Sequence, residues 1–464
     1  MITSNNLPAS SSGRDVTKPL PVSYKQLTII YMVLLIVPWV LSFEDGLAIR
    51  GLFQESVVFL TIVGMTMMYL QFLFSTRHPA ISNTLGIDQG MRLHRKMGEW
   101  LGLLFFLHPL LILAPRFWLA PQLAWGDLWS AFSADESLTG LIAWFGLIIW
   151  VLMSMFKEKV GLSYEAWRYG HSIGFVAIII LATHHAVTVG RHGRYDPWFD
   201  VLWISLCCLA VGGVIYNYTV RPMRTKRQPF KVVDCHKAGT DDWCLTIEKD
   251  GDFDFRFDAG QFVWLSSADN AFNRREHPFS IASAPSRLPQ MSFIIRALGD
   301  YTRNLDQLKP GMPVHIEGPH GAFTLNNRVN EGIALIAGGA GIGPILGILR
   351  SLREQGDKRP IRLIYGNRNF QQCVFQEEIE ACCNDLDFKQ ILVLENPPSA
   401  DKYAGTVYSG FINPSILTEH VCSPEQTNWD YYICGPKIMV HAVEDQLKSL
   451  NVANNRIIFE ALSF

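Results

Sequence analysis

Residues 94–108 read HRKMGEWLGLLFFLH, and residues 171–185 read HSIGFVAIIILATHH. Each stretch is largely apolar, begins with a histidine and ends with another histidine fourteen residues later. On an α-helix, fourteen residues advance about 21 Å and return the side chain to nearly the same face. Two such helices side by side would place imidazole rings opposite one another at two levels. We expect this pattern to decide the architecture of the N-terminal half.

Six apolar segments of near membrane-crossing length occupy that half of the chain. They cover residues 25–43, 54–74, 95–114, 138–156, 172–190 and 198–220. A helix needs about 20 apolar residues to cross a bilayer. A buried core helix is the alternative explanation for any one segment, but six in succession with almost no charge favour membrane spans. We therefore predict a six-helix transmembrane domain in a lipid bilayer over residues 25–222, preceded by a polar, disordered tail over residues 1–24.

Lysine and arginine residues indicate which way these helices run. If the N-terminus lies inside, fourteen of them up to Arg227 fall on inner segments, and the outer loops carry only Arg50, Arg116, Arg191 and Arg194. This bias is typical of the cytoplasmic side. We expect a multi-pass protein of the cytoplasmic (inner) membrane with both termini in the cytoplasm. The formal net charge of −2 gives no indication of nucleic-acid binding.

The histidines within the spans are candidate metal ligands. An imidazole in hydrocarbon needs a partner, and the alternative to a metal is a hydrogen bond to a neighbouring helix. Because the third and fifth helices run in the same direction, His94 is level with His171 near the cytoplasm, and His108 is level with His185 near the outside. Two nitrogen ligands for each iron predict two six-coordinate haems. On a straight helix, the fourteen residues from His171 to His185 rotate the side chain by about −40°, whereas the thirteen to His184 rotate it by about −140°. A straight helix therefore favours His185, and a local bulge would favour His184.

From Pro229 onward the pattern changes to short alternating strands separated by turn residues. The expected strands are Phe230–Cys235, Trp243–Glu248, Phe262–Ser266, Met291–Arg296 and Val314–Glu317. Several short strands at this spacing favour a small antiparallel β-barrel, which we place at residues 223–326.

Three motifs follow one another in this barrel: HPFS at 277–280, IIRALGDYT at 294–302 and EGPHG at 317–321. A flavin nucleotide needs an aromatic or apolar wall for its ring, and hydroxyls or cations for its pyrophosphate. Phe279 supplies such a wall, and Ser280, Arg296 and Thr302 supply the polar groups. Each motif alone is weak, but the three in this order predict an FAD site.

A second nucleotide site is predicted at residues 327–464. An apolar strand at Gly332–Ala337 runs into the glycine-rich sequence GGAGIGP and then into a helix at Ile345–Arg353. Glycines at such a turn let the backbone approach a pyrophosphate, whose charge the helix N-terminus favours. Further strands are expected at Ile361–Tyr365, Phe388–Leu394 and Tyr431–Cys434. The candidate contacts are Gly338, Gly339, Gly341, Gly343 and Pro344, together with Cys434, Gly435 and Pro436 at the end of the last of these strands.

Three further residues are candidates near the reacting rings or the nucleotide. Arg368 follows a strand and could contact a 2′-phosphate, which favours NADPH; the alternative is a solvated loop arginine, with NADH as the donor. Phe464 ends the chain and could stack on a flavin face, or it could simply pack against the last strand. Cys434 would lie beside the nicotinamide, and we predict Cys434 and Phe464 to be the residues at the site of hydride transfer.

Together these motifs resemble those of the ferric reductase and NADPH oxidase superfamily, over residues 27–464. In that family a six-helix haem-binding membrane domain is fused to a ferredoxin-NADP reductase-like module, and the compact prokaryotic NADPH oxidase-like proteins are the most similar. Its flavin motif matches at residues 277–280, which adds His277 and Pro278 to the FAD contacts. A histidine stands where soluble ferredoxin reductases usually have an arginine.

The resemblance extends to the other sites. The family's nicotinamide loop matches at Gly338–Pro344 and its Cys-Gly-Pro motif at Cys434–Pro436. Its haem ligands match the histidines named above, and members with thirteen-residue spacing on the fifth helix keep His184 as an alternative. The family often has an aromatic residue at the position of Leu462, so the flavin-stacking role is expected to pass to Phe464. The implied cofactors are FAD, two b-type haems and NADPH.

The resulting functional hypothesis is electron transfer from cytoplasmic NADPH, through FAD and two haems, to an acceptor on the outer side. The acceptor would be oxygen, giving superoxide, or a ferric chelate. One alternative is an electron-donating subunit that serves a dedicated periplasmic protein or quinone. Another, of a different class, is a non-catalytic membrane redox sensor.

Overall fold

The computed structural model describes residues 24–43, 46–75, 87–161, 163–192, 196–267, 276–326, 330–398, 405–423 and 428–462. The chain divides into two compact units. The first contains residues 1–162 and 170–213, and the second contains residues 163–169 and 214–464.

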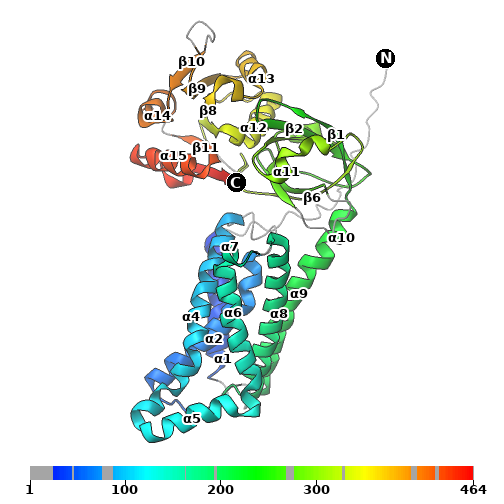
Figure 1. The fold of residues 1–464 in the computed structure, drawn as a ribbon. Coiled ribbons are helices and arrows are strands. Elements are labelled where there is room, and N and C mark those ends of the chain that lie inside the picture. The colour runs from blue at the N-terminus through cyan, green and yellow to red at the C-terminus, as the bar shows by residue number, and fades with distance from the viewer. Residues whose placement is uncertain are drawn as a thin grey trace, which may run out of the picture. The chain divides into compact units, whose positions relative to one another are not determined.

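Six helices of the described chain are long and apolar enough to cross a membrane. They are α1 (Tyr24–Leu41), α2 (Leu52–Ser75), α4 (Ile87–Leu119), α6 (Leu138–Met155), α8 (Tyr164–Thr188) and α9 (Pro197–Ile215). Figure 1 shows them running alongside one another as a bundle. The expected six-helix half is therefore confirmed.

Helical boundaries differ from the expected segments in three places. The third helix, α4, has 33 residues and begins at Ile87, so its first turns lie before the apolar segment. A short helix, α5 (Pro121–Ser133), follows it. The last span continues through a π-helical turn (Tyr216–Val220) into α10 (Arg221–Lys226). Backbone hydrogen bonds sustain a helix through polar residues as well as apolar ones, so hydropathy alone does not define these ends.

The centre of the bundle is packed around α2, α8 and α9. Tyr69 of α2 is fully buried, and its hydroxyl hydrogen bonds to the Thr183 hydroxyl of α8 at 2.7 Å. The Tyr69 ring also packs against Trp203 of α9, with ring centroids 5.6 Å apart. These contacts fix the position of α8, one of the two helices that carry the paired histidines.

The second unit begins with an antiparallel sheet of six strands. They are β1 (Phe230–Lys237), β2 (Asp242–Lys249), β3 (Phe262–Ser266), β4 (His277–Ser280), β5 (Gln290–Arg296) and β6 (Pro313–His320). Their order is β4-β3-β6-β1-β2-β5. A bridge between Ile281 and Phe293 joins the two ends of this order, as expected for a barrel. The short helix α11 (Asp300–Arg303) follows β5.

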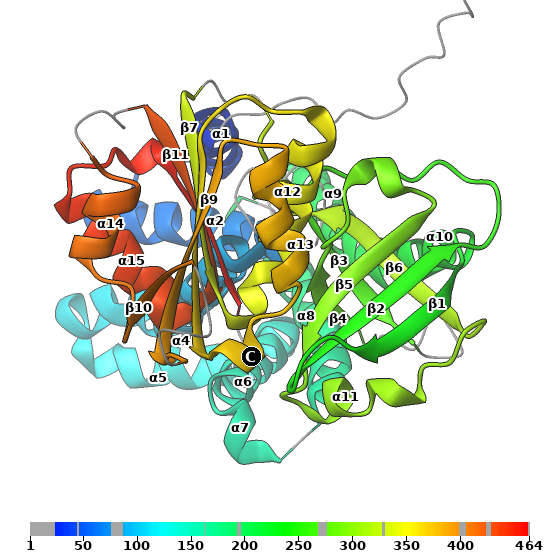
Figure 2. The same ribbon diagram turned by 90° about the horizontal axis from the view of Figure 1, so that it is seen from above.

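The remainder of this unit is a parallel sheet with helices on both faces. Its strands are β7 (Gly332–Gly338), β8 (Ile361–Asn369), β9 (Phe388–Asn396), β10 (Thr406–Ser409), β11 (Trp429–Pro436) and β12 (Ile457–Leu462), in the order β10-β9-β8-β7-β11-β12. Its helices are α12 (Ile342–Gln355), α13 (Gln376–Ala381), α14 (Pro414–His420) and α15 (Lys437–Ser449). Figure 2 shows α12 and α13 on the face towards the barrel, and α14 and α15 on the other. The central strand β7 is buried along its whole length, which suits a sheet covered on both faces.

Candidate functional site

The structure brings two of the predicted ligand histidines together inside the helical unit. The ring centroids of His94 on α4 and His171 on α8 are 6.2 Å apart, with an interplanar angle of 70°. A metal–imidazole bond is about 2.0 Å long, so this separation suits one ion between the two rings. The Nδ1 atom of His94 lies 3.3 Å from the carbonyl of Gln71. Since a carbonyl only accepts, Nδ1 carries the proton there and Nε2 is left as the potential ligand.

The level that is predicted to lie near the outer side, called the outer level below, holds three histidines. His108 Nδ1 lies 3.2 Å from the Thr61 hydroxyl of α2, and His184 Nδ1 lies 3.1 Å from the Thr139 hydroxyl of α6. His185 packs against Gly140 of α6, where an added Cβ would come within 2.4 Å of its Nδ1. That Nδ1 is buried and has no hydrogen-bond partner among the described residues. A metal-bound histidine almost always has a partner on its other nitrogen, so His184 has the more typical environment of a ligand.

The donor set fits haem better than a bare metal ion. No group of three or more His, Cys, Asp or Glu side chains in the described parts of the chain could hold a metal. Histidines in pairs suit an iron whose remaining four ligands are porphyrin nitrogens. The inner pair and its hydrogen-bonded nitrogens are therefore compatible with a six-coordinate haem.

In the second unit, three rings gather where the flavin is expected. His277 and Phe279 lie on the same face of β4, two residues apart. The ring of Tyr301, on α11, stacks on His277 with centroids 4.1 Å apart and an angle of 14°. Tyr301 and Phe279 are nearly parallel at 6.4 Å. This aromatic patch is of the kind that the FAD prediction calls for, and Ser280 lies at the end of the same strand.

His277 differs in charge from the arginine that is expected at this position in soluble reductases. Burial lowers the pKa of His277 from its ordinary value of 6.5. Its ring is therefore neutral at neutral pH, and it offers a hydrogen bond rather than a positive charge. Burial also raises the pKa of the Tyr301 hydroxyl, which stays protonated.

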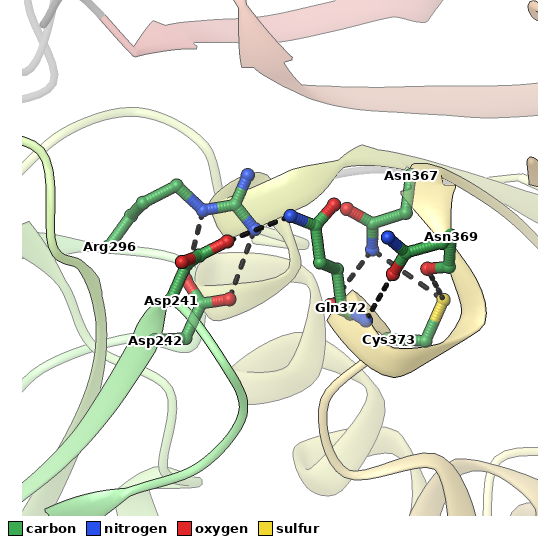
Figure 3. Close-up of polar contacts among 7 residues, drawn as sticks. All are labelled: Asp241, Asp242, Arg296, Asn367, Asn369, Gln372 and Cys373. Carbon is green, nitrogen blue, oxygen red and sulfur yellow. Dashed lines mark hydrogen bonds and ion pairs between the residues drawn. The ribbon is translucent and has the colours of Figure 1, made fainter. Parts of the chain in front are cut away.

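Arg296 is held by a carboxylate that the sequence motifs do not include. It donates two hydrogen bonds to Asp242, from Nε at 3.1 Å and from Nη2 at 3.0 Å (Figure 3). The two residues face each other in the register of β2 and β5, and the Asp242 side chain is only 1% exposed. Burial opposes the charge of Arg296, but the bonds to Asp242 outweigh it and raise the arginine pKa. Arg296 is thus a permanent, oriented cation.

The other side of Arg296 meets the glycine-rich loop. A Cβ added to Gly339, whose φ is +52°, would lie 2.5 Å from Arg296 Nη1. The residue before Asp242 also contacts the parallel-sheet domain. Asp241 accepts a hydrogen bond from Gln372 at 2.8 Å (Figure 3). An arginine of the flavin domain therefore stands beside the predicted nicotinamide loop.

Thr302 has a local structural role. The amides of Leu298 and Gly299 each donate to its hydroxyl oxygen at 3.0 Å, and the hydroxyl donates to the Gly299 carbonyl at 3.2 Å. These bonds fix the turn that carries Tyr301. The predicted contact of Thr302 with FAD stays a prediction.

The two predicted nicotinamide segments come together at the carboxyl ends of β7 and β11. Cys434 is in register with Ala337, the residue before the glycine-rich sequence. A Cβ added to Gly341 would lie 2.1 Å from the Cys434 carbonyl, so only glycine fits there. Burial raises the pKa of the Cys434 thiol well above its ordinary value. The thiol is therefore protonated, and its position suits a neutral contact rather than a nucleophile.

The remaining predicted residues lie at the edges of this site. Gly343 and Pro344 are buried in the first turn of α12. Arg368, near the end of β8, is exposed and has no hydrogen bond or ion pair with any residue the structure describes. Phe464 lies outside the described residues. The last described residue, Leu462, is in register with Pro436.

Some residues of the site were not identified from the sequence. Tyr301 lies inside a quoted motif, and its aromatic ring beside Thr302 was an available signal. Asp242 faces Arg296 across two neighbouring antiparallel strands that are far apart in the sequence, so no local pattern pointed to the pair. Ser154, whose hydroxyl lies 3.0 Å from His171 Nδ1, is a polar residue in an apolar helix.

Comparisons with known proteins identify all three regions. A family described as "Ferric reductase like transmembrane component" matches residues 60–182. A family described as "FAD-binding domain" matches residues 228–324, and one described as "Oxidoreductase NAD-binding domain" matches residues 335–445.

Individual relatives match part of the chain. It is 29% identical over 218 residues to the reductase component of propane 2-monooxygenase from Mycolicibacterium goodii, which covers 46% of this chain and 60% of that protein. It is 30% identical over 216 residues to a component of the Na(+)-translocating NADH-quinone reductase of Psychrobacter arcticus, covering 43% and 51% respectively. The chain thus spans about half to three fifths of the length of these curated relatives.

Solved structures of reductases also align with part of this chain. A cytochrome P450 reductase from Amycolatopsis has a TM-score of 0.44 and 22% sequence identity, over 50% of this chain and 69% of that one. The three family matches, in their order along the chain, show the domain architecture of this protein. It has the ferric reductase and NADPH oxidase-like architecture, in which a ferric reductase-like transmembrane component is followed by FAD-binding and NAD-binding oxidoreductase domains.

Proposed function

We propose that this protein carries electrons from cytoplasmic NADPH, through FAD and two b-type haems, to an acceptor on the outer side of the cytoplasmic membrane. The acceptor is oxygen, which gives superoxide, or a ferric chelate. The observation that carries the proposal is the His94–His171 pair, 6.2 Å apart in the same chain as the flavin and nicotinamide domains. The chemistry supplied by the bound groups is hydride transfer from nicotinamide to FAD, followed by single-electron transfer through the haems.

The inner haem would be held by His94 and His171, and the outer one by His108 with a histidine of α8. Helical spacing favours His185 as the fourth ligand. The contact between Nδ1 and the Thr139 hydroxyl favours His184, because His94, His108 and His171 also have a hydrogen-bonding oxygen beside Nδ1. The haem content of His184→Ala and of His185→Ala decides between them.

In the dehydrogenase half, β4 and α11 would hold the flavin. His277, Phe279 and Tyr301 supply an aromatic surface and a neutral hydrogen-bonding ring. Pro278 is exposed on the strand between them. Ser280 and Thr302 supply hydroxyls near the strand and turn. A flavin bound there would be oriented by stacking, and its ring would be shielded from water on that side.

Arg296, which was predicted as an FAD contact, also lies beside the glycine-rich loop, and we propose that it helps this loop to bind the nicotinamide nucleotide. The Asp242 carboxylate keeps the guanidinium charged and aimed, and one nitrogen lies against Gly339. A pyrophosphate at this loop would meet backbone amides, the N-terminus of α12 and this cation. Arg368, an exposed cation near the end of β8, would contact a 2′-phosphate and favour NADPH over NADH.

A second candidate acceptor is quinone. It is favoured by the likeness to a component of a Na(+)-translocating NADH-quinone reductase. In that case the protein would reduce its haems with NADPH but would reduce oxygen and ferric chelates slowly.

The acceptor can be tested with the purified protein in lipid nanodiscs. We would add NADPH and FAD and measure cytochrome c reduction with and without superoxide dismutase, beside formation of a ferrous-chelator complex. Reduction that the dismutase suppresses identifies oxygen, and ferrous complex formation without oxygen identifies a ferric chelate. Rapid NADPH oxidation that needs added quinone would support the second candidate, and no oxidation with any acceptor would contradict the proposed function.

A further inference from the structure

Helix α6 holds the His171 ring from two directions. The Trp150 indole stacks on this ring, with centroids 4.2 Å apart and an interplanar angle of 14°. One turn later, the Ser154 hydroxyl lies 3.0 Å from His171 Nδ1. Residues four apart share one face of a helix, so α6 presents a flat ring and a hydrogen bond to the same imidazole.

Helix α8 is shaped to receive the indole. Gly174 lies one turn after His171, and a Cβ added there would lie 2.5 Å from Trp150 Nε1. Any larger residue at this position would displace the indole from the histidine. A buried tryptophan N–H usually finds a partner. The Nε1 of Trp150 is buried and has none in the described structure, so packing on His171 and Gly174 holds this ring.

The other tryptophan in the middle of α6 has a different environment. Trp144 donates a hydrogen bond from Nε1 to the Phe106 carbonyl at 3.2 Å, and it stacks on the Phe106 ring. The ring contact recorded for His108 is an edge contact with Phe105 at 6.0 Å. No tryptophan stacks on His108, His184 or His185 among the residues described. The stacked indole is therefore specific to the inner level.

We propose that Trp150 is a positioning residue for His171: it fixes the plane of the inner ligand and keeps water from that side of the ring. This rests on the proposed haem ligation. Outer-shell groups orient ligands, and the apolar shell sets the dielectric around a metal and thereby its reduction potential. Water beside the site stabilises the oxidised form, which carries the extra positive charge. The stacked indole thus raises the potential of the inner site.

The test compares Trp150→Leu, Trp150→Phe and Gly174→Ala with the matched control Trp144→Leu in the same helix. Haem content is measured by the pyridine haemochrome method, and potentials are measured by spectroelectrochemical titration. The redox transition of the inner haem is the one that is absent from the titration of His171→Ala. Electron paramagnetic resonance of the oxidised low-spin haems reports the ligand planes.

We expect Trp150→Leu to lower the inner potential by an amount that corresponds to about a tenfold change in the reduced-to-oxidised ratio, roughly 59 mV. Gly174→Ala should also lower the inner potential. Trp150→Phe should keep the potential close to that of the unmodified protein, and Trp144→Leu should leave it unchanged. The inner resonance should change in the same variants.

Haem-loaded variants with an unchanged inner potential and resonance would overturn the inference. So would a shift in Trp144→Leu as large as that in Trp150→Leu. If Trp150→Leu fails to load haem, Gly174→Ala and Trp150→Phe decide the outcome by the same criteria. Absence of haem from the unmodified protein would instead refute the proposed function, so the two failures are distinguishable.

Discussion

The inner and outer levels of the helical unit hold their histidines in different ways. At the inner level, one ring from α4 faces one ring from α8 across 6.2 Å, and α6 supports the second ring with an indole and a hydroxyl. At the outer level, α8 offers two neighbouring histidines, and only His184 has a hydrogen bond on Nδ1. The inner site is built around one possible pair, whereas the outer site has a choice of ligand.

The difference indicates where electron transfer is most sensitive to sequence. A ring that is stacked, hydrogen-bonded and opposed by its partner has few alternative positions. A level with two adjacent imidazoles can exchange one ligand for the other. We therefore expect that replacing either inner histidine removes a haem. At the outer level, we expect that only one of the two histidines of α8 is needed for haem binding.

The largest effect is expected from the inner pair. His94→Ala and His171→Ala should each remove one haem and abolish NADPH-driven reduction of any external acceptor, because no other described histidine lies opposite the remaining ring. Haem content per protein, by the pyridine haemochrome method, and turnover are the measurements. His78 lies between the second and third apolar segments of the sequence, so His78→Ala serves as the control and should keep both haems. Full activity in either inner variant would disprove this ligand pair.

At the outer level, His184→Ala and His185→Ala are expected to differ. The hydrogen-bond pattern predicts that His184→Ala loses the outer haem while His185→Ala keeps both. The helical spacing predicts the reverse. The haem content of the two variants, measured side by side with His108→Ala, separates these possibilities. Retention of both haems in both variants would mean that the two residues substitute for one another.

Removing the hydroxyl partners should sharpen the comparison. Thr139→Ala removes the partner of His184, and the loss of such a group typically costs about 10–100-fold in metal affinity. Ser154→Ala should cost less, because Trp150 still holds the His171 ring. Haem retention during dialysis against apomyoglobin measures both. A larger loss in Ser154→Ala than in Thr139→Ala would contradict the greater rigidity of the inner level.

The smallest effect concerns the donor rather than the haem levels. Arg368→Ala should raise the KM for NADPH about tenfold, since a hydrogen bond to a charged group contributes about 1.5 kcal/mol. The KM for NADH should not change, because NADH lacks the 2′-phosphate. Steady-state kinetics with both nucleotides provide the measurement. Equal changes for the two nucleotides would assign Arg368 to another role.

Sequence patterns were sufficient for the parts of the fold that depend on local chemistry. Apolar length predicted the six helices, and alternation predicted most strands, because both reflect the burial of nearby side chains. The polar start of α4 before residue 95 was missed, since Asp88 and Arg92 interrupt the apolar pattern without breaking the helix.

Contacts between residues far apart in the sequence could not be predicted from sequence patterns. The Asp242–Arg296 pair and the Trp150–His171 stack join residues from different elements, and only the packing of the elements brings them together. The spacing of His94 and His171 from their partners indicated two levels. It did not indicate that His184 and His185 would differ in their hydrogen bonding, because that depends on where α6 places Thr139 and Gly140.

The most direct test of the central claim is the absorbance spectrum of the purified full-length protein with FAD, before and after addition of NADPH in the absence of oxygen. We predict low-spin haem bands that correspond to two haems per chain, and we predict that NADPH reduces both. Absence of these bands, or their failure to reduce with NADPH while dithionite reduces them, would contradict electron transfer from nicotinamide to the paired histidine sites.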